Sequence, residues 1–272
     1  MKKLLAIFLC LVMLLSVFVS CDEKDKKKND ENDDPNSAIQ SEIDALLAVA
    51  GEKLQTVPYK ETEKQTQKVK VFVSGQTMDQ NDTKTTYYQW DGNNMVSYSD
   101  KYGKDVTMIY YNGVFYVPTT MKKFPLSAKE VEEAFGVAGF DDEWFDSFKF
   151  KEIKVTKNDN GTTTIFGKGA SEEAAAAASG ILGEIGSSTG MNITMDYDSM
   201  ESTLTLDAEG ALIRQDYKVS FSADVKLDET TMSMSGTILT ECTYAYGEKY
   251  KVSAPANLDE FKTASSIDDL AG

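Results

Sequence analysis

A strict two-residue alternation runs for a dozen residues in the last quarter of the chain. Its apolar positions are Tyr217, Val219, Phe221, Ala223, Val225 and Leu227, and polar residues stand between them. Because successive side chains of a strand point to opposite faces, this run predicts one face on a core or cavity and one face in water. Its length is about twice that of an ordinary strand, which is typical of a curved sheet or half-barrel.

The same period begins at Gln67 and recurs along much of the chain. Asp91-Gly92 and Asn112-Gly113 stand between such runs, and these dipeptides are strong hairpin signals because both turn residues must accept positive φ. We therefore predict about eleven antiparallel strands. After the first, the predicted strands cover residues 85–90, 95–99, 106–111, 114–117, 148–156, 162–166, 192–197, 201–207, 211–227, 231–246 and 250–253.

Three helices are expected among these strands. The first opens at Ser37 with an apolar stripe at helical spacing and ends before Pro58. The second covers residues 126–147, where Ser127 and Glu130 form a capping-box pattern, and an alanine-rich third covers residues 171–185. The predicted fold class is α+β: a curved antiparallel sheet, or incomplete β-barrel, with helices covering its concave side.

The first 21 residues resemble a bacterial lipoprotein signal. Lys2 and Lys3 precede an uncharged apolar run of about 16 residues, which is short for a membrane-spanning helix. The run closes in Phe18-Val19-Ser20-Cys21, at the place of a lipobox, although Phe18 stands where leucine is usual. The resemblance implies cleavage before Cys21, a diacylglycerol thioether on its sulfur and a lipid-anchored protein on the extracytoplasmic face of the cell membrane. An ordinary secretory signal is the alternative.

The predicted organisation follows from what comes after Cys21. Residues 22–36 are highly charged and contain no large apolar residue, so they are expected to form a disordered tether. We expect a signal peptide over 1–20, the lipidated cysteine and tether over 21–36, one domain over 37–260 and a C-terminal tail over 261–272. With Cys10 removed and Cys21 lipidated, Cys242 would be the one cysteine of the domain, expected as a buried inert thiol.

Composition argues against several functions. Without the signal the chain has 26 basic and 44 acidic residues, a charge that repels nucleic acid. The chain has no histidine, which excludes Ser-His-Asp and Cys-His catalysis and histidine-containing zinc sites. The acidic run at residues 141–146 lacks the alternating ligands of a calcium loop. We therefore expect no catalytic residues, no cofactor and no metal site.

The order of the elements is similar to that of the LolA/LppX-like superfamily of envelope lipid and lipoprotein carriers. An N-terminal helix, a meander with helical inserts and a long strand pair run into the ending Tyr246-Gly247 through Pro255. The resemblance covers roughly residues 38–260. It implies a hydrophobic cavity between a concave sheet and its helices.

The cavity is expected to contain methionines that fall in register on strand faces, because methionine adapts to variable apolar ligands. Ordinary core filling is the alternative. The alanine-rich helix is expected as a movable lid, or else as a connector. The candidate cavity residues are Met191, Ile193, Met195, Tyr217, Val219, Phe221, Met232, Met234, Ile181 and Leu182.

The expected function is non-catalytic binding of a hydrophobic molecule, with a lipid as the first choice. The expected partners are the membrane, through the lipid on Cys21, and that ligand. The alternative is an interaction or sensory module with a filled core that binds another envelope protein.

Overall fold

The computed structural model describes residues 36–73, 75–101, 103–127, 130, 150–170, 192–227, 230–266 and 268–271. One α-helix with defined bounds lies in these residues, α2 (Asn36–Thr56), and twelve strands follow it. No helix in the described residues has both the length and the apolar character needed to cross a membrane.

The twelve strands form one sheet. They are β1 (Tyr59–Val73), β2 (Gln76–Trp90), β3 (Met95–Ser99), β4 (Gly103–Tyr111), β5 (Val114–Val117), β6 (Lys122–Pro125), β7 (Phe150–Lys157), β8 (Thr163–Ala170), β9 (Asn192–Leu206), β10 (Leu212–Leu227), β11 (Thr230–Tyr246) and β12 (Lys262–Thr263). Their order is β12-β6-β5-β4-β3-β2-β1-β11-β10-β9-β8-β7. Every neighbouring pair is antiparallel except β12 and β6. The sheet is open, because β12 and β7 each have a neighbour on one side only.

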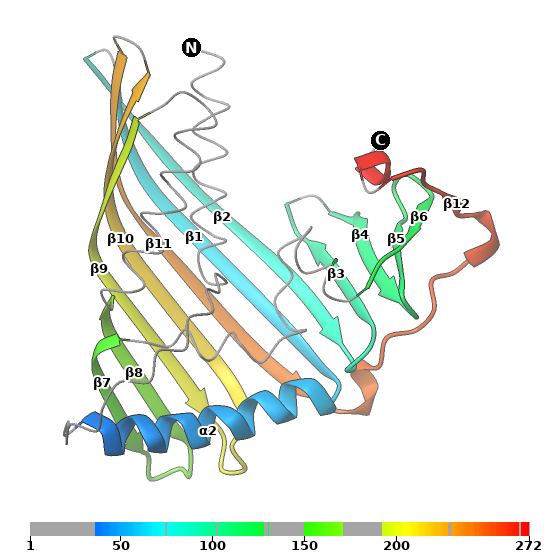
Figure 1. Cartoon of the computed structure of the whole chain (residues 1–272), viewed down its shortest axis with the longest axis horizontal. Helices are drawn as coiled ribbons and strands as arrows, with labels where there is room; N and C mark the ends of the chain where they lie inside the picture. The colour runs from blue at the N-terminus through cyan, green and yellow to red at the C-terminus, as the bar shows by residue number, and fades with distance from the viewer. Residues whose placement is uncertain are drawn as a thin grey trace, which may run out of the picture.

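Five long strands, β2, β1, β11, β10 and β9, run side by side through the middle of the sheet (Figure 1). Each has 15 to 17 residues. α2 crosses beneath their lower ends, and the short strands β3–β6 stand to one side with the C-terminal residues (Figure 1). The long strands therefore extend well away from the helix.

α2 packs on the sheet through one stripe of side chains. Ile43, Leu47 and Ala50 recur at helical spacing and are buried. They form a cluster with buried side chains of β8, β9 and β10: Ile165, Leu204, Leu206 and Leu212. The helix ends at Thr56, because Pro58 cannot continue it. Burial of each large apolar side chain contributes roughly 1.5–3 kcal/mol.

A second core cluster joins the short strands to the chain end. It contains Tyr59, Trp90, Met95, Tyr110, Phe115, Leu126, Ala264 and Leu270. The region after residue 260, expected to be a tail, thus supplies buried side chains, and its strand β12 pairs with β6. Phe261 is also buried and makes an edge-on contact with Tyr116 at a centroid separation of 5.2 Å.

The predicted α+β class is wrong: the described structure is mostly β. The curved antiparallel sheet agrees in part with the prediction, but among the described residues no helix covers the concave side. α2 packs at the lower end of the sheet alone (Figure 1). The two further helices were predicted from the capping box at Ser127 and from the alanine-rich run at residues 171–185. The body of those segments, residues 131–149 and 171–191, lies outside the described residues.

The start of the second expected helix does lie within the structure, and its capping box is confirmed. The Ser127 backbone N–H donates to Glu130 Oε2 at 2.7 Å, and the Glu130 backbone N–H donates to Ser127 Oγ at 3.2 Å. This reciprocal pair satisfies two donors that a helix start leaves unpaired.

Candidate functional site

The candidate site lies on one face of the five long strands. We call this the inner face, and define it by Tyr59, Val69 and Val71 of β1 and by their neighbours across the ladders. Antiparallel register places the side chains of adjacent strands in rows on a common face. From the α2 end upward, the rows form an aromatic floor, a polar belt and an upper apolar zone. The floor is the row of Tyr59, Tyr246 and Trp90.

The upper apolar zone is formed by β1, β11 and β10. Its buried members are Val69, Val71, Met232, Met234, Ile238, Val219, Phe221, Ala223 and Val225. None of them belongs to the cluster under α2 or to the cluster at the chain end. The inner face therefore carries an apolar surface that is separate from both of these core clusters.

The polar belt lies between this zone and the floor. Six polar residues are buried in the described chain, and the strand registers place all of them in the belt: Gln65, Thr86, Ser97, Ser99, Ser202 and Gln215. Some are paired: Gln65 Oε1 accepts a hydrogen bond from Gln67 Nε2 at 2.9 Å. Burial of polar groups costs free energy unless they are hydrogen-bonded, so such a belt adds little to stability and marks a site candidate.

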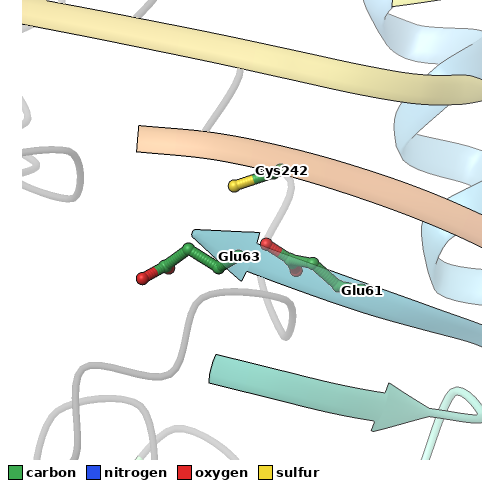
Figure 2. Close-up of side chains that lie close together, drawn as sticks. All are labelled: Glu61, Glu63 and Cys242. Carbon is green, nitrogen blue, oxygen red and sulfur yellow. The ribbon is translucent and has the colours of Figure 1, made fainter. Parts of the chain in front are cut away.

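Two glutamates and a cysteine come together in the belt. Glu61 and Glu63 stand two residues apart on β1, and Glu63 faces Cys242 across the β1–β11 ladder. One ligand atom from each side chain lies within 4.8 Å of the other two. Figure 2 shows the three side chains gathered at the junction of the two strands. We call them the acidic–thiol cluster.

Burial sets the protonation of this cluster. It raises the pKa of the Glu61 carboxyl to about 7, with repulsion from Glu63 as the next cause, while hydrogen bonds from Cys242 and Tyr244 partly offset the rise. Burial likewise raises the pKa of Glu63, against the opposing charge of Lys84. The pKa of the Cys242 thiol is raised well above its usual value by burial and by the two glutamates. The cluster therefore retains protons that exposed carboxyls would release.

A further polar atom lies beside the cluster without a well-formed hydrogen bond. Thr86 of β2 pairs with Glu63 across the ladder, so both side chains are on the inner face. Thr86 is 6% exposed, and its Oγ1 has no well-formed hydrogen bond; its one polar neighbour on β2 is the weakly interacting hydroxyl of Tyr88. A buried hydroxyl left in this state costs about 1–3 kcal/mol, which a ligand at this position would recover.

The outer face of the sheet carries a different feature. A hollow of about 300 Å³ lies near the far ends of the long strands, lined by Lys70, Phe72, Asp196 and Asp224 together with serines and threonines. Phe72 is 50% exposed there. Its lining is mixed: most of the lining residues are polar, but Phe72, Ala223 and Met234 contribute apolar surface.

The structure places the candidate cavity residues as follows. Val219, Phe221, Met232 and Met234 are buried in the upper apolar zone, and Met234 also contributes to the outer hollow. Tyr217 is partly buried in the belt, in register with Thr240. Ile193 and Met195 pair through their backbones with β10.

The remaining candidates, Met191, Ile181, Leu182 and the lipidation site Cys21, lie outside the described residues.

Sequence reasoning missed the acidic–thiol cluster. Cys242 is buried, as expected, but it does not stand alone. Glu61 and Glu63 precede the first predicted strand, which was expected to start at Gln67, whereas β1 starts at Tyr59. Two glutamates at strand spacing were the available signal, but the partner strand that brings Cys242 to them cannot be identified from that spacing.

Comparisons with known proteins do not identify a family. No protein-family model matches the sequence, and no curated protein matches it. A DUF1329 family protein from Desulfovibrio piger aligns over 75% of this chain and 91% of its own, with 12% identity and a TM-score of 0.21. The outer membrane protein OprG from Pseudomonas aeruginosa aligns over 71% and 98%, with 6% identity and a TM-score of 0.17. TM-scores this low do not indicate a shared fold, and the LolA/LppX-like resemblance stays a prediction.

Proposed function

We propose that this protein is a lipid-anchored envelope protein that binds an amphipathic, lipid-like molecule on the inner face of its sheet, without catalysis. The observation that carries the proposal is the upper apolar zone, an apolar surface on three adjacent long strands that neither described core cluster uses. Acyl chains would lie against this zone, where each buried CH₂ contributes about 0.8 kcal/mol.

The boundary between the zones favours an amphipathic molecule over a purely apolar one. Gln65 and Gln215 are buried in the belt, one or two rows below the apolar side chains. Their amides can both donate and accept hydrogen bonds, as a polar headgroup requires. Binding sites of this kind combine an apolar lining with a few placed polar groups.

The signal-like N-terminus supports the proposed location. A thioether-linked diacylglycerol on Cys21 would hold the domain next to its ligand's source, because two acyl chains give stable anchoring. Cys21→Ala is expected to release the protein from the membrane fraction, and unchanged membrane retention would overturn the anchor.

Ligand binding is tested with a matched pair of phenylalanines. Phe221 is 1% exposed in the upper apolar zone, whereas Phe72 is 50% exposed on the outer face. The purified chain should bind a fluorescent fatty acid, and Phe221→Ala should weaken that binding at least fivefold. Phe72→Ala serves as the control and should bind like the unmodified chain.

Circular dichroism and thermal melts establish that both variants are folded. If the folded chain neither binds the probe nor yields lipid on solvent extraction, lipid binding is refuted. A filled core that binds an envelope protein would then be the better interpretation.

A further inference from the structure

We propose that the acidic–thiol cluster binds a divalent transition-metal ion such as Zn²⁺, with the Thr86 hydroxyl oxygen as a fourth ligand. This site does not depend on lipid binding, because it lies in the polar belt and uses none of the apolar side chains above it.

The donor atoms suit such an ion. A thiolate and two carboxylates are an established ligand chemistry for Zn²⁺, whereas a thiolate is a poor ligand for Ca²⁺ or Mg²⁺. Ligand atoms of a tetrahedral zinc site lie about 3.3–3.8 Å apart, as follows from metal–ligand bonds of about 2.0–2.3 Å. The three ligand atoms of the cluster lie within 4.8 Å of one another, so a shift of about 1 Å in the glutamate side chains would close the site.

Thr86 supplies the independent observation. Its buried hydroxyl has no well-formed hydrogen bond and stands opposite Glu63, on the same face as the cluster. Residues opposite each other in an antiparallel pair have Cβ atoms about 4.5–5.5 Å apart, which puts the hydroxyl within reach of an ion held by Glu63. A neutral oxygen there, or a water molecule next to it, completes a four-coordinate shell.

The exposure of the ligands and the charge of the chain are also compatible with cation binding. Cys242 is 6% exposed, whereas both glutamates are partly exposed, so an ion would enter from the glutamate side. The chain carries a formal charge of −16, and Lys84 is the cation that acts on Glu63. A negative field of this kind raises the local concentration of divalent cations.

Cobalt tests the site, because thiolate-bound Co²⁺ has a charge-transfer absorption that identifies cysteine ligation. The full chain, purified in detergent and freed of metal with a chelator, should bind one equivalent of Co²⁺ with this absorption, and Zn²⁺ should displace it. Cys242→Ser should abolish the absorption. A cobalt–thiolate absorption that persists in this variant would come from another cysteine and would overturn the proposal.

Further variants separate ligands from bystanders. Glu61→Gln and Glu63→Gln should each weaken Co²⁺ binding at least tenfold, and the isosteric Thr86→Val should weaken it two- to tenfold. Glu241→Gln is the control: it removes a carboxylate next to Cys242 in sequence, on the opposite face, where Glu241 pairs with Arg214 and Lys64. It should bind like the unmodified chain.

A second readout covers any variant that folds poorly. Zn²⁺ should raise the thermal unfolding temperature of the unmodified chain and of Glu241→Gln, and should leave that of Cys242→Ser unchanged. Absence of a stoichiometric cobalt absorption in the folded, unmodified chain refutes the site.

Discussion

Glu61 lies directly opposite Tyr244 across the β1–β11 ladder, and the tyrosine hydroxyl, which donates to Gln215 Oε1 at 3.4 Å, acts to lower the pKa of the glutamate. Burial nevertheless dominates and raises the pKa of Glu61 from 4.5 to about 7. Between these two values the folded chain holds a proton that the unfolded chain has released. Stability therefore falls as the pH rises through this window.

Glu61→Gln should remove this pH dependence, because glutamine resembles the protonated acid. In the presence of a chelator, the variant and the unmodified chain should be about equally stable at pH 5. At pH 8 the variant should be more stable by up to about 3 kcal/mol. Urea unfolding at the two pH values measures the difference, and a variant that is equally destabilised at both would contradict the assignment.

Ile43 and Ile39 stand one turn apart on α2 and test how the helix packs. Ile43 is fully buried among β8, β9 and β10, whereas Ile39 is 38% exposed. Ile43→Ala should lower the free energy of unfolding by about 2–4 kcal/mol, and Ile39→Ala by well under 1 kcal/mol. Chemical denaturation compares them; equal losses would mean that the helix packs on another face.

Gly236 of β11 leaves no room for a side chain against β1. A Cβ atom built there would lie 2.6 Å from the Lys68 carbonyl oxygen and 3.0 Å from Val69 Cγ2. Because the first of these atoms is backbone, it cannot move aside cheaply. Gly236→Ala should destabilise the fold by about 1–3 kcal/mol, while Ser235→Ala, at an exposed neighbour, should change stability by less than about 0.5 kcal/mol. A neutral Gly236→Ala would show that the strands can separate there.

Leu270 anchors the end of the chain. It is 2% exposed in the cluster of Trp90 and Phe115, and its carbonyl accepts a hydrogen bond from Thr120 Oγ1 at 3.0 Å. Leu270→Ala should cost about 2–4 kcal/mol, whereas Thr263→Ala, at an exposed position of β12, should cost little. Thermal unfolding measures both, and an undiminished melting temperature for Leu270→Ala would mean that the chain end contributes nothing to the core.

Local chemistry explains which parts of the fold were predictable. The turn at Asn112-Gly113 is confirmed, with φ of 50° and 75°. It could be predicted because asparagine and glycine are the residues that adopt positive φ most readily. The alternation in β10 is also confirmed, since Val219, Phe221 and Val225 are buried. Each of these signals is contained within one short run of consecutive residues.

The missed parts depend on distant neighbours. In the first half of β2, apolar residues do not alternate with polar ones as in a typical strand. Its residues nevertheless pair in unbroken register with β1. Its conformation comes from the ladder and not from its own side chains. The predicted strand at residues 250–253 is wrong: Tyr250 ends a 3₁₀ turn and the residues after it are irregular. The acidic–thiol cluster also depends on strand pairing and not on local sequence, because the β1–β11 ladder brings Cys242 to Glu63.

That central pairing also orders the events of folding. Tyr59 pairs with Tyr246, so the ladder that joins the two halves of the sheet spans most of the chain. Strands β1–β6 and β7–β11 can each form from sequential hairpins, but closing the loop between them carries an entropic cost and slows assembly. A chain still emerging from the ribosome has an unpaired β1 edge until β11 is complete. Until then β1–β6 is a hairpin array with an exposed edge at β1, and the edge of a second copy of the chain could pair there in place of β11.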